Sequence, residues 1–97
     1  MWVDLRVTDM MKRARERWAM LSDDERAVLA YAYRDAFLNP HRVGNYKLEF
    51  RRMKSSKKYM QIHNFRFGYA NFILIVIEES TFIYDLWLDP SLALAAE

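Results

Sequence analysis

Residues that could bind or cleave a phosphate backbone are concentrated in the middle third of the chain. The stretch YKLEFRRMKSSKK, residues 46–58, holds six basic side chains and one acidic side chain. The basic residues are Lys47, Arg51, Arg52, Lys54, Lys57 and Lys58, with Arg42 before them and Arg66 after them. The interleaved aromatic residues are Tyr46, Phe50, Tyr59 and Phe65. Basic groups pair with phosphates and exposed aromatic rings stack on unpaired bases, so the combination favours single-stranded RNA over duplex grooves.

The charge of the chain is divided unevenly along its length. Residues 1–40 carry 7 basic and 7 acidic side chains, residues 41–68 carry 8 and 1, and residues 69–97 carry none and 5. A concentrated basic surface steers anionic ligands, whereas an evenly mixed surface does not. We therefore expect the middle third to form one basic sheet surface that faces a polyanion or an acidic partner. The alternative is a solvated basic face without a partner.

His63 is the histidine best placed for proton transfer. It lies two residues after Gln61 and three before Arg66, where a general acid or base could face a bound phosphate. The alternative is a partly buried histidine whose ring is satisfied by the backbone. His41 follows Asn39 and Pro40 in a loop and is expected to be solvated.

The composition argues against metal, thiol and cofactor chemistry. The chain has no cysteine and only two histidines, and Glu78 and Glu79 are adjacent in an expected strand, so their side chains point to opposite faces. It also has no glycine-rich phosphate loop and no paired-carboxylate site. We expect neither a metal nor a cofactor.

The first 40 residues read as one short strand followed by two helices. Residues 2–7, WVDLRV, alternate in polarity and predict a strand. Thr8 or Asp9 is then expected to cap a helix that runs to Leu21. The sequence SDDE, residues 22–25, predicts a capping box at the start of a second helix over residues 23–38. Its buried face is expected to contain Val28, Leu29, Ala32, Tyr33, Ala36 and Phe37.

From residue 46 onward the hydrophobic period changes to two, which predicts four strands. They are expected over residues 46–51, 59–67, 72–79 and 81–88, with KSSKK as the first turn. In the second strand the apolar phase moves from Met60 and Ile62 to Phe65 and Phe67, which predicts a bulge at His63 and Asn64. The continuous apolar run FILIVI suits a strand covered on both sides. Pro90 is expected to start a short C-terminal helix.

These elements predict one α+β domain over residues 1–97. An N-terminal short strand, a two-helix antiparallel hairpin and a short C-terminal helix would accompany an antiparallel sheet of about four strands, with the hairpin packed on the sheet. Both faces of the last strand are largely apolar, so one of them could bind a partner chain or a homodimer mate. The charged N-terminus and the short apolar runs predict a cytoplasmic protein that does not contact a membrane.

The element order, the sequence NPHRVGNYKL after the second helix and the sequence FRFG before a hydrophobic strand resemble the RelE/ParE superfamily of toxin–antitoxin toxins. Arg66 and Gly68 match the family feature of an arginine two residues before a glycine. The resemblance covers nearly the whole chain as topology, whereas its specific motifs amount to a handful of residues.

For RelE-like members the resemblance implies metal-independent cleavage of mRNA on the ribosome, with an acidic antitoxin segment as the natural partner. Arg66 would contact the scissile phosphate, and Lys54, Lys57 and Lys58 would be looser candidates for backbone binding or proton transfer. Tyr84 is the residue left near the last strand that could complete the site.

The chain departs from that pattern in two places. It has NFILIV where many members carry a second arginine, and YDLWLDP where an arginine, histidine or tyrosine often completes the site. These departures favour a ParE-like protein that poisons DNA gyrase or a noncatalytic relative. The contrary class is a small phage or mobile-element protein that inhibits a partner by occluding its surface.

Overall fold

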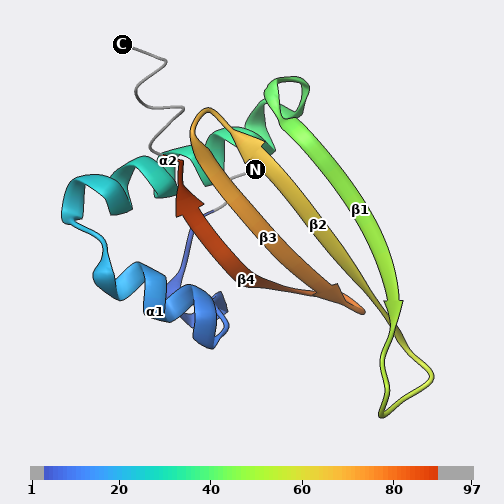
Figure 1. Ribbon diagram of the computed structural model, residues 1–97. Coiled ribbons are helices and arrows are strands. Elements are labelled where there is room, and N and C mark those ends of the chain that lie inside the picture. Colours follow the sequence, from blue (N-terminus) through green and yellow to red (C-terminus); the bar gives the residue numbers. More distant parts are fainter. Residues whose placement is uncertain (1–3, 90–97) are drawn as a thin grey trace.

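The computed structural model describes residues 4–89 and is an α+β fold in which both helices precede all strands (Figure 1). The helices are α1 (Lys12–Met20) and α2 (Asp23–Leu38), and single 3-10 turns lie at Val7–Asp9 and Pro40–Arg42. The strands are β1 (Gly44–Arg52), β2 (Tyr59–Phe67), β3 (Ala70–Ile77) and β4 (Ser80–Leu88). The predicted C-terminal helix, residues 90–97, lies outside the described residues. None of the helices between residues 4 and 89 has the length and apolar character needed to cross a membrane.

The four strands form one antiparallel sheet in the order β1-β2-β3-β4, so each strand pairs with its neighbour in the sequence. The predicted sheet of about four strands is confirmed. Short turns join the strands, and Gly68 in the β2–β3 turn has a φ of 61°, which glycine adopts without a steric cost. The other glycine, Gly44, opens β1 beside a register shift between Gly44 and Lys47.

The predicted N-terminal strand is not formed by its described part. Asp4, Leu5 and Arg6 have no regular secondary structure, and Val7 begins a 3-10 turn. Met10 then makes one isolated parallel bridge with Ile83, and the amide of Met11 donates to the carbonyl oxygen of Ile83 at 2.8 Å. Because α1 begins only at Lys12, the chain has just enough extended backbone to contact β4 once before it turns into the helix.

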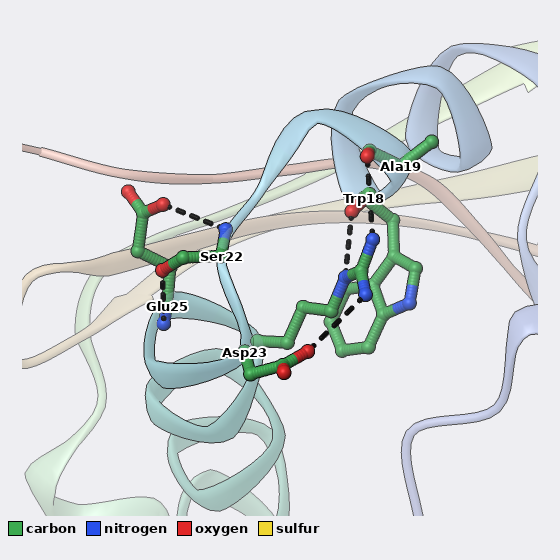
Figure 2. A network of polar contacts seen from close by, with 6 residues as sticks. Trp18, Ala19, Ser22, Asp23 and Glu25 are labelled. Carbon is green, nitrogen blue, oxygen red and sulfur yellow. Dashed lines mark hydrogen bonds and ion pairs between the residues drawn. The ribbon is translucent and has the colours of Figure 1, made fainter.

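The second helix begins at the residues that the sequence indicated. The Ser22 hydroxyl accepts from the Glu25 amide at 3.2 Å, and the Ser22 amide donates to Glu25 Oε1 at 2.9 Å (Figure 2). Both bonds satisfy amides that would otherwise lack a partner at the helix start. Arg26 ties the two helices together because its guanidinium donates to the carbonyl oxygens of Trp18 and Ala19.

The two helices pack on the sheet more than on each other. In Figure 1 the chain reverses direction between α1 and α2; α1 lies against β4, and α2 crosses β2, β3 and β4. The predicted helix hairpin is therefore spread open. We call the side covered by α2 the helix face; it is identified by the contact of Tyr33 with Phe72, whose ring centroids are 5.4 Å apart.

The core lies between α2, α1 and the helix face. Its buried members include Met10, Ala14, Leu29, Ala32, Tyr33, Ala36, Phe65, Phe72, Leu74, Ile83 and Leu86. Val28 and Phe37, which were predicted to be buried with them, are exposed. A helix that covers only one face of a sheet buries a narrower stripe than the sequence pattern suggested.

The predicted bulge at His63 and Asn64 is wrong, because β2 pairs with β3 without interruption from Met60 to Phe67. Phe65 and Phe67 lie on the helix face, whereas Met60 and Ile62 lie on the opposite side, which we call the open face. The change of apolar phase along β2 therefore reflects apolar residues on both faces of a regular strand. No helix of the described chain covers the open face over β2 and β3, so β3 is not covered on both sides as expected.

Candidate functional site

The β1–β2 hairpin extends beyond the rest of the sheet and carries most of the predicted binding residues. We call residues 51–58 the basic arm; it contains Arg51, Arg52, Lys54, Lys57 and Lys58 and no acidic residue. Figure 1 shows its turn projecting past the β3–β4 turn. The amide of Met53 donates to the carbonyl oxygen of Lys58 at 2.9 Å, which closes the turn. Every basic side chain of the arm is exposed.

Two of the five cations of the basic arm are held by carboxylates. Arg51 Nε lies 3.1 Å from Glu49 Oε2, and Lys58 forms an ion pair with Glu78 of the β3–β4 turn. Within residues 4–89 no carboxylate pairs with Arg52, Lys54 or Lys57. These three cations give the end of the arm its uncompensated positive charge.

The expectation of one basic sheet surface is not met. Strand alternation places Lys47, Arg51 and Arg66 on the open face and Arg52 on the helix face, opposite Tyr59. Lys54 and Lys57 lie in the turn. Arg42 lies at the other end of β1, with its guanidinium 5.4 Å from the centre of the Phe67 ring. The positive charge is therefore distributed around a projecting ribbon.

The four residues predicted to form a catalytic site are not brought together. His63 and Arg66 are three residues apart in a regular strand, so their side chains lie on opposite faces. Lys54 is in the turn of the basic arm. Tyr84 lies at the register shift of β4, close to Arg13 of α1. The pKa of the Arg13 guanidinium is raised mainly by Asp85 and to a smaller extent by Tyr84. No single phosphate could contact all four side chains.

His63 has two side-chain partners that the sequence did not indicate. Its Nε2 lies 3.0 Å from Gln61 Oε1, and its Nδ1 lies 2.5 Å from the Tyr46 hydroxyl. An amide oxygen only accepts, so Nε2 carries the proton and Nδ1 accepts from Tyr46. Partial burial lowers the pKa of His63 below its usual value of 6.5, which favours the neutral ring.

A cleft of about 980 Å³ lies beside this histidine on the helix face. Its floor includes Tyr46, His63 and Phe65, and Tyr33 and Phe37 of α2 form one side. Asp4, Arg6 and Asp9 of the N-terminal segment also line it. The unprotonated nitrogen of His63 is already occupied by the Tyr46 hydroxyl, and Arg66 lies on the other face of the sheet and cannot help to stabilise a developing negative charge. The cation that does line the cleft, Arg6, is paired with Asp9 at 3.0 Å, so the described residues of the cleft offer no free cationic group for phosphodiester cleavage.

Asp85 has a structural role. It is 3% exposed, and its carboxylate lies 2.9 Å from Arg13 Nε and 2.8 Å from Arg17 Nε of α1. The Leu86 amide donates to the same carboxylate at 2.9 Å. Because the two arginines are four residues apart, they lie on one side of α1 and hold the helix to β4. Arg13 and Asp85 are 72 residues apart, so no local sequence pattern indicated this contact.

Among the described residues, no group of three or more histidine, cysteine, aspartate or glutamate side chains is arranged to hold a metal ion. No protein-family model, curated protein or solved structure matches the chain.

Proposed function

We propose that the protein binds single-stranded RNA through the basic arm and acts by binding rather than by cutting. The observation that carries this proposal is the exposed, uncompensated charge of Arg52, Lys54 and Lys57 at the end of a projecting hairpin. A narrow cationic ribbon can follow a flexible phosphate backbone along either face. Accordingly, the opposite orientations of Arg51 and Arg52 do not prevent a common ligand from reaching both.

Two exposed aromatic rings at the base of the basic arm support an RNA ligand. Phe50 and Tyr59 are each 61% exposed and lie on the helix face, beyond the part that α2 covers. Arg52 lies opposite Tyr59 on the same face. A base stacked on either ring would bring its phosphate close to Arg52, which is the arrangement that sequence-tolerant single-strand binders use.

The resemblance to RelE/ParE toxins suggests where such an RNA would be bound and what would compete with it. The RNA would be engaged on the ribosome, and an acidic antitoxin segment would compete for the basic arm. The separation of His63 from Arg66 supports a noncatalytic mode of action. The same separation favours one alternative, a protein that uses the arm to occlude an acidic protein surface such as that of DNA gyrase.

Fluorescence anisotropy with an end-labelled single-stranded RNA tests the proposal. Each phosphate contact contributes about 0.7 to the slope of log affinity against log salt, so losing two contacts should lower the slope by about 1.4 and the affinity by roughly 25-fold at 0.1 M salt. We expect this change for Lys54→Gln/Lys57→Gln. The matched control, Lys12→Gln/Arg34→Gln, removes the same charge from the two helices and should have little effect.

The aromatic contribution is measured separately. Phe50→Ala and Tyr59→Ala should each weaken RNA binding by about 1–3 kcal/mol without changing the salt slope. If the Lys54/Lys57 variant and its control bind RNA equally, the arm is not the RNA-binding surface. Cleavage of the RNA by wild type but not by His63→Ala would contradict the noncatalytic part of the proposal.

A further inference from the structure

The outer edge of β1 is unpaired within the described chain. β1 is the first strand of the sheet order and pairs only with β2, and Figure 1 shows no element beside its other edge. Alternate amide and carbonyl groups of an edge strand point away from the sheet, where they can pair with another strand. The pairing of β1 with β2 is regular from Lys47 to Arg52, whereas a register shift between Gly44 and Lys47 disturbs the beginning of the strand.

The side chains along this edge form a symmetric pattern. Tyr46, Leu48 and Phe50 lie on the helix face and are 53%, 44% and 61% exposed. Lys47 and Glu49 lie between them on the open face and are both exposed. An antiparallel copy of the same strand, centred on Leu48, would place Tyr46 opposite Phe50, Leu48 opposite Leu48, and Lys47 opposite Glu49.

From this self-complementarity we propose that two copies of the chain associate through antiparallel pairing of their β1 edges, with Leu48 on the two-fold axis. The pairing joins the two four-stranded sheets into one continuous sheet. It places apolar pairs on the helix face and Lys47–Glu49 ion pairs on the open face. Opposite charges directly across from each other stabilise a strand pair, whereas like charges destabilise it.

Neighbouring registers are less favourable than the one centred on Leu48. Centring the pair on Glu49 would place Lys47 opposite Arg51 twice, and centring it on Lys47 would place Lys47 beside its own copy. A one-residue slip of a single strand would place apolar residues opposite charged ones. The contact is small compared with interfaces of about 1,200–2,000 Å², so we expect a concentration-dependent dimer rather than a permanent one.

The proposal does not depend on RNA binding. If both hold, the antiparallel arrangement of β1 directs the two basic arms to opposite ends of the dimer. The pair would then contact two separate stretches of a polyanion.

Charge reversal tests the pairing by sedimentation equilibrium with nucleic-acid-free protein. Lys47→Glu places two carboxylates opposite each other across the edge, and Glu49→Lys places two ammonium groups there. Each single variant should therefore dimerise at least about tenfold more weakly than wild type. An equimolar mixture of the two variants restores opposite charges across the edge and should form the mixed dimer. Wild-type protein that stays monomeric up to about 1 mM, or variants whose mixture does not associate, would overturn the proposal.

Cysteine cross-linking tests the register in the same protein, which has no cysteine of its own. Directly opposite residues of an antiparallel pair have Cα atoms about 4.5–5.5 Å apart, within the range that a disulfide spans. Leu48→Cys should therefore form a covalent dimer when oxidised glutathione accepts the thiol electrons. Phe50→Cys is the matched control, because residue 50 pairs with residue 46 and not with itself. Equal cross-linking of both variants, or of neither, would refute the register.

Discussion

Removing the two arginines that hold Asp85 should destabilise the protein more than removing the charge of Asp85 itself. The reason is the unequal exposure of the partners. The Arg13 and Arg17 side chains are 58% and 46% exposed, whereas the Asp85 side chain is 4% exposed. Water already reaches the half-exposed arginines and can solvate them when the carboxylate is gone. The carboxylate lies where water hardly reaches, so it is harder to solvate when the arginines are gone.

The expected magnitudes follow from this difference. Asp85→Asn keeps the shape and the acceptor for the Leu86 amide and loses two charge-assisted bonds to half-exposed partners, which should cost about 2 kcal/mol. Arg13→Gln/Arg17→Gln leaves a buried carboxylate without a cation, which typically costs about 3–5 kcal/mol. The triple variant has no charge left at the site and should be more stable than the double variant.

Urea unfolding followed by circular dichroism measures these differences, provided that the slope against urea stays the same among the variants. Glu16→Gln is a suitable control, because it removes a surface pair with Lys12 whose atoms are 4.0 Å apart and should change stability by less than about 0.5 kcal/mol. If Asp85→Asn is as destabilising as the double arginine variant, or if the triple variant is the least stable of all, the desolvation argument is wrong.

Two further predictions concern the capping box and His63. Ser22→Ala removes the hydroxyl that accepts from the Glu25 amide and disturbs the bond from the Ser22 amide to Glu25 Oε1, so the free energy of unfolding should fall by about 1 kcal/mol. An unchanged urea midpoint would show that tertiary contacts alone position the start of α2. Because the folded-state pKa of His63 lies below its usual value of 6.5, the unfolded chain binds more protons, and stability should decline as pH falls through about 6.5. His63→Gln should abolish this part of the decline, and an NMR titration of His63 with a midpoint above 6.5 would contradict the argument.

The parts of the fold that follow from local chemistry could be predicted from the sequence. Ser22 and Glu25 are three residues apart, so their capping box is visible as a pattern, and α2 begins where the pattern indicates. β1, β2 and β4 follow from alternation, and β3 follows from a continuous apolar run. The N-terminal strand was predicted by the same alternation, but a strand needs several consecutive paired residues, and among residues 4–11 only Met10 forms a bridge to β4.

The parts that depend on register could not be predicted. Tyr46 and His63 are 17 residues apart, and their hydrogen bond exists only because Leu48 pairs with His63 in the observed register. Likewise, a change of apolar phase in β2 can indicate either a bulge or a strand with two apolar faces. Only the pairing with β3 distinguishes the two, and it shows that His63 and Arg66 cannot act on one phosphate.

The meander order of the sheet has a consequence for how the chain folds. Each strand needs only a short turn to find its partner, so little loop-closure entropy opposes formation of the sheet. The Arg13–Asp85 contact, by contrast, closes a segment of 72 residues. Docking of α1 is therefore the topologically slow step, and an early, helix-free sheet would expose the apolar side chains of its helix face, in addition to those of the open face, until the helices have packed on it.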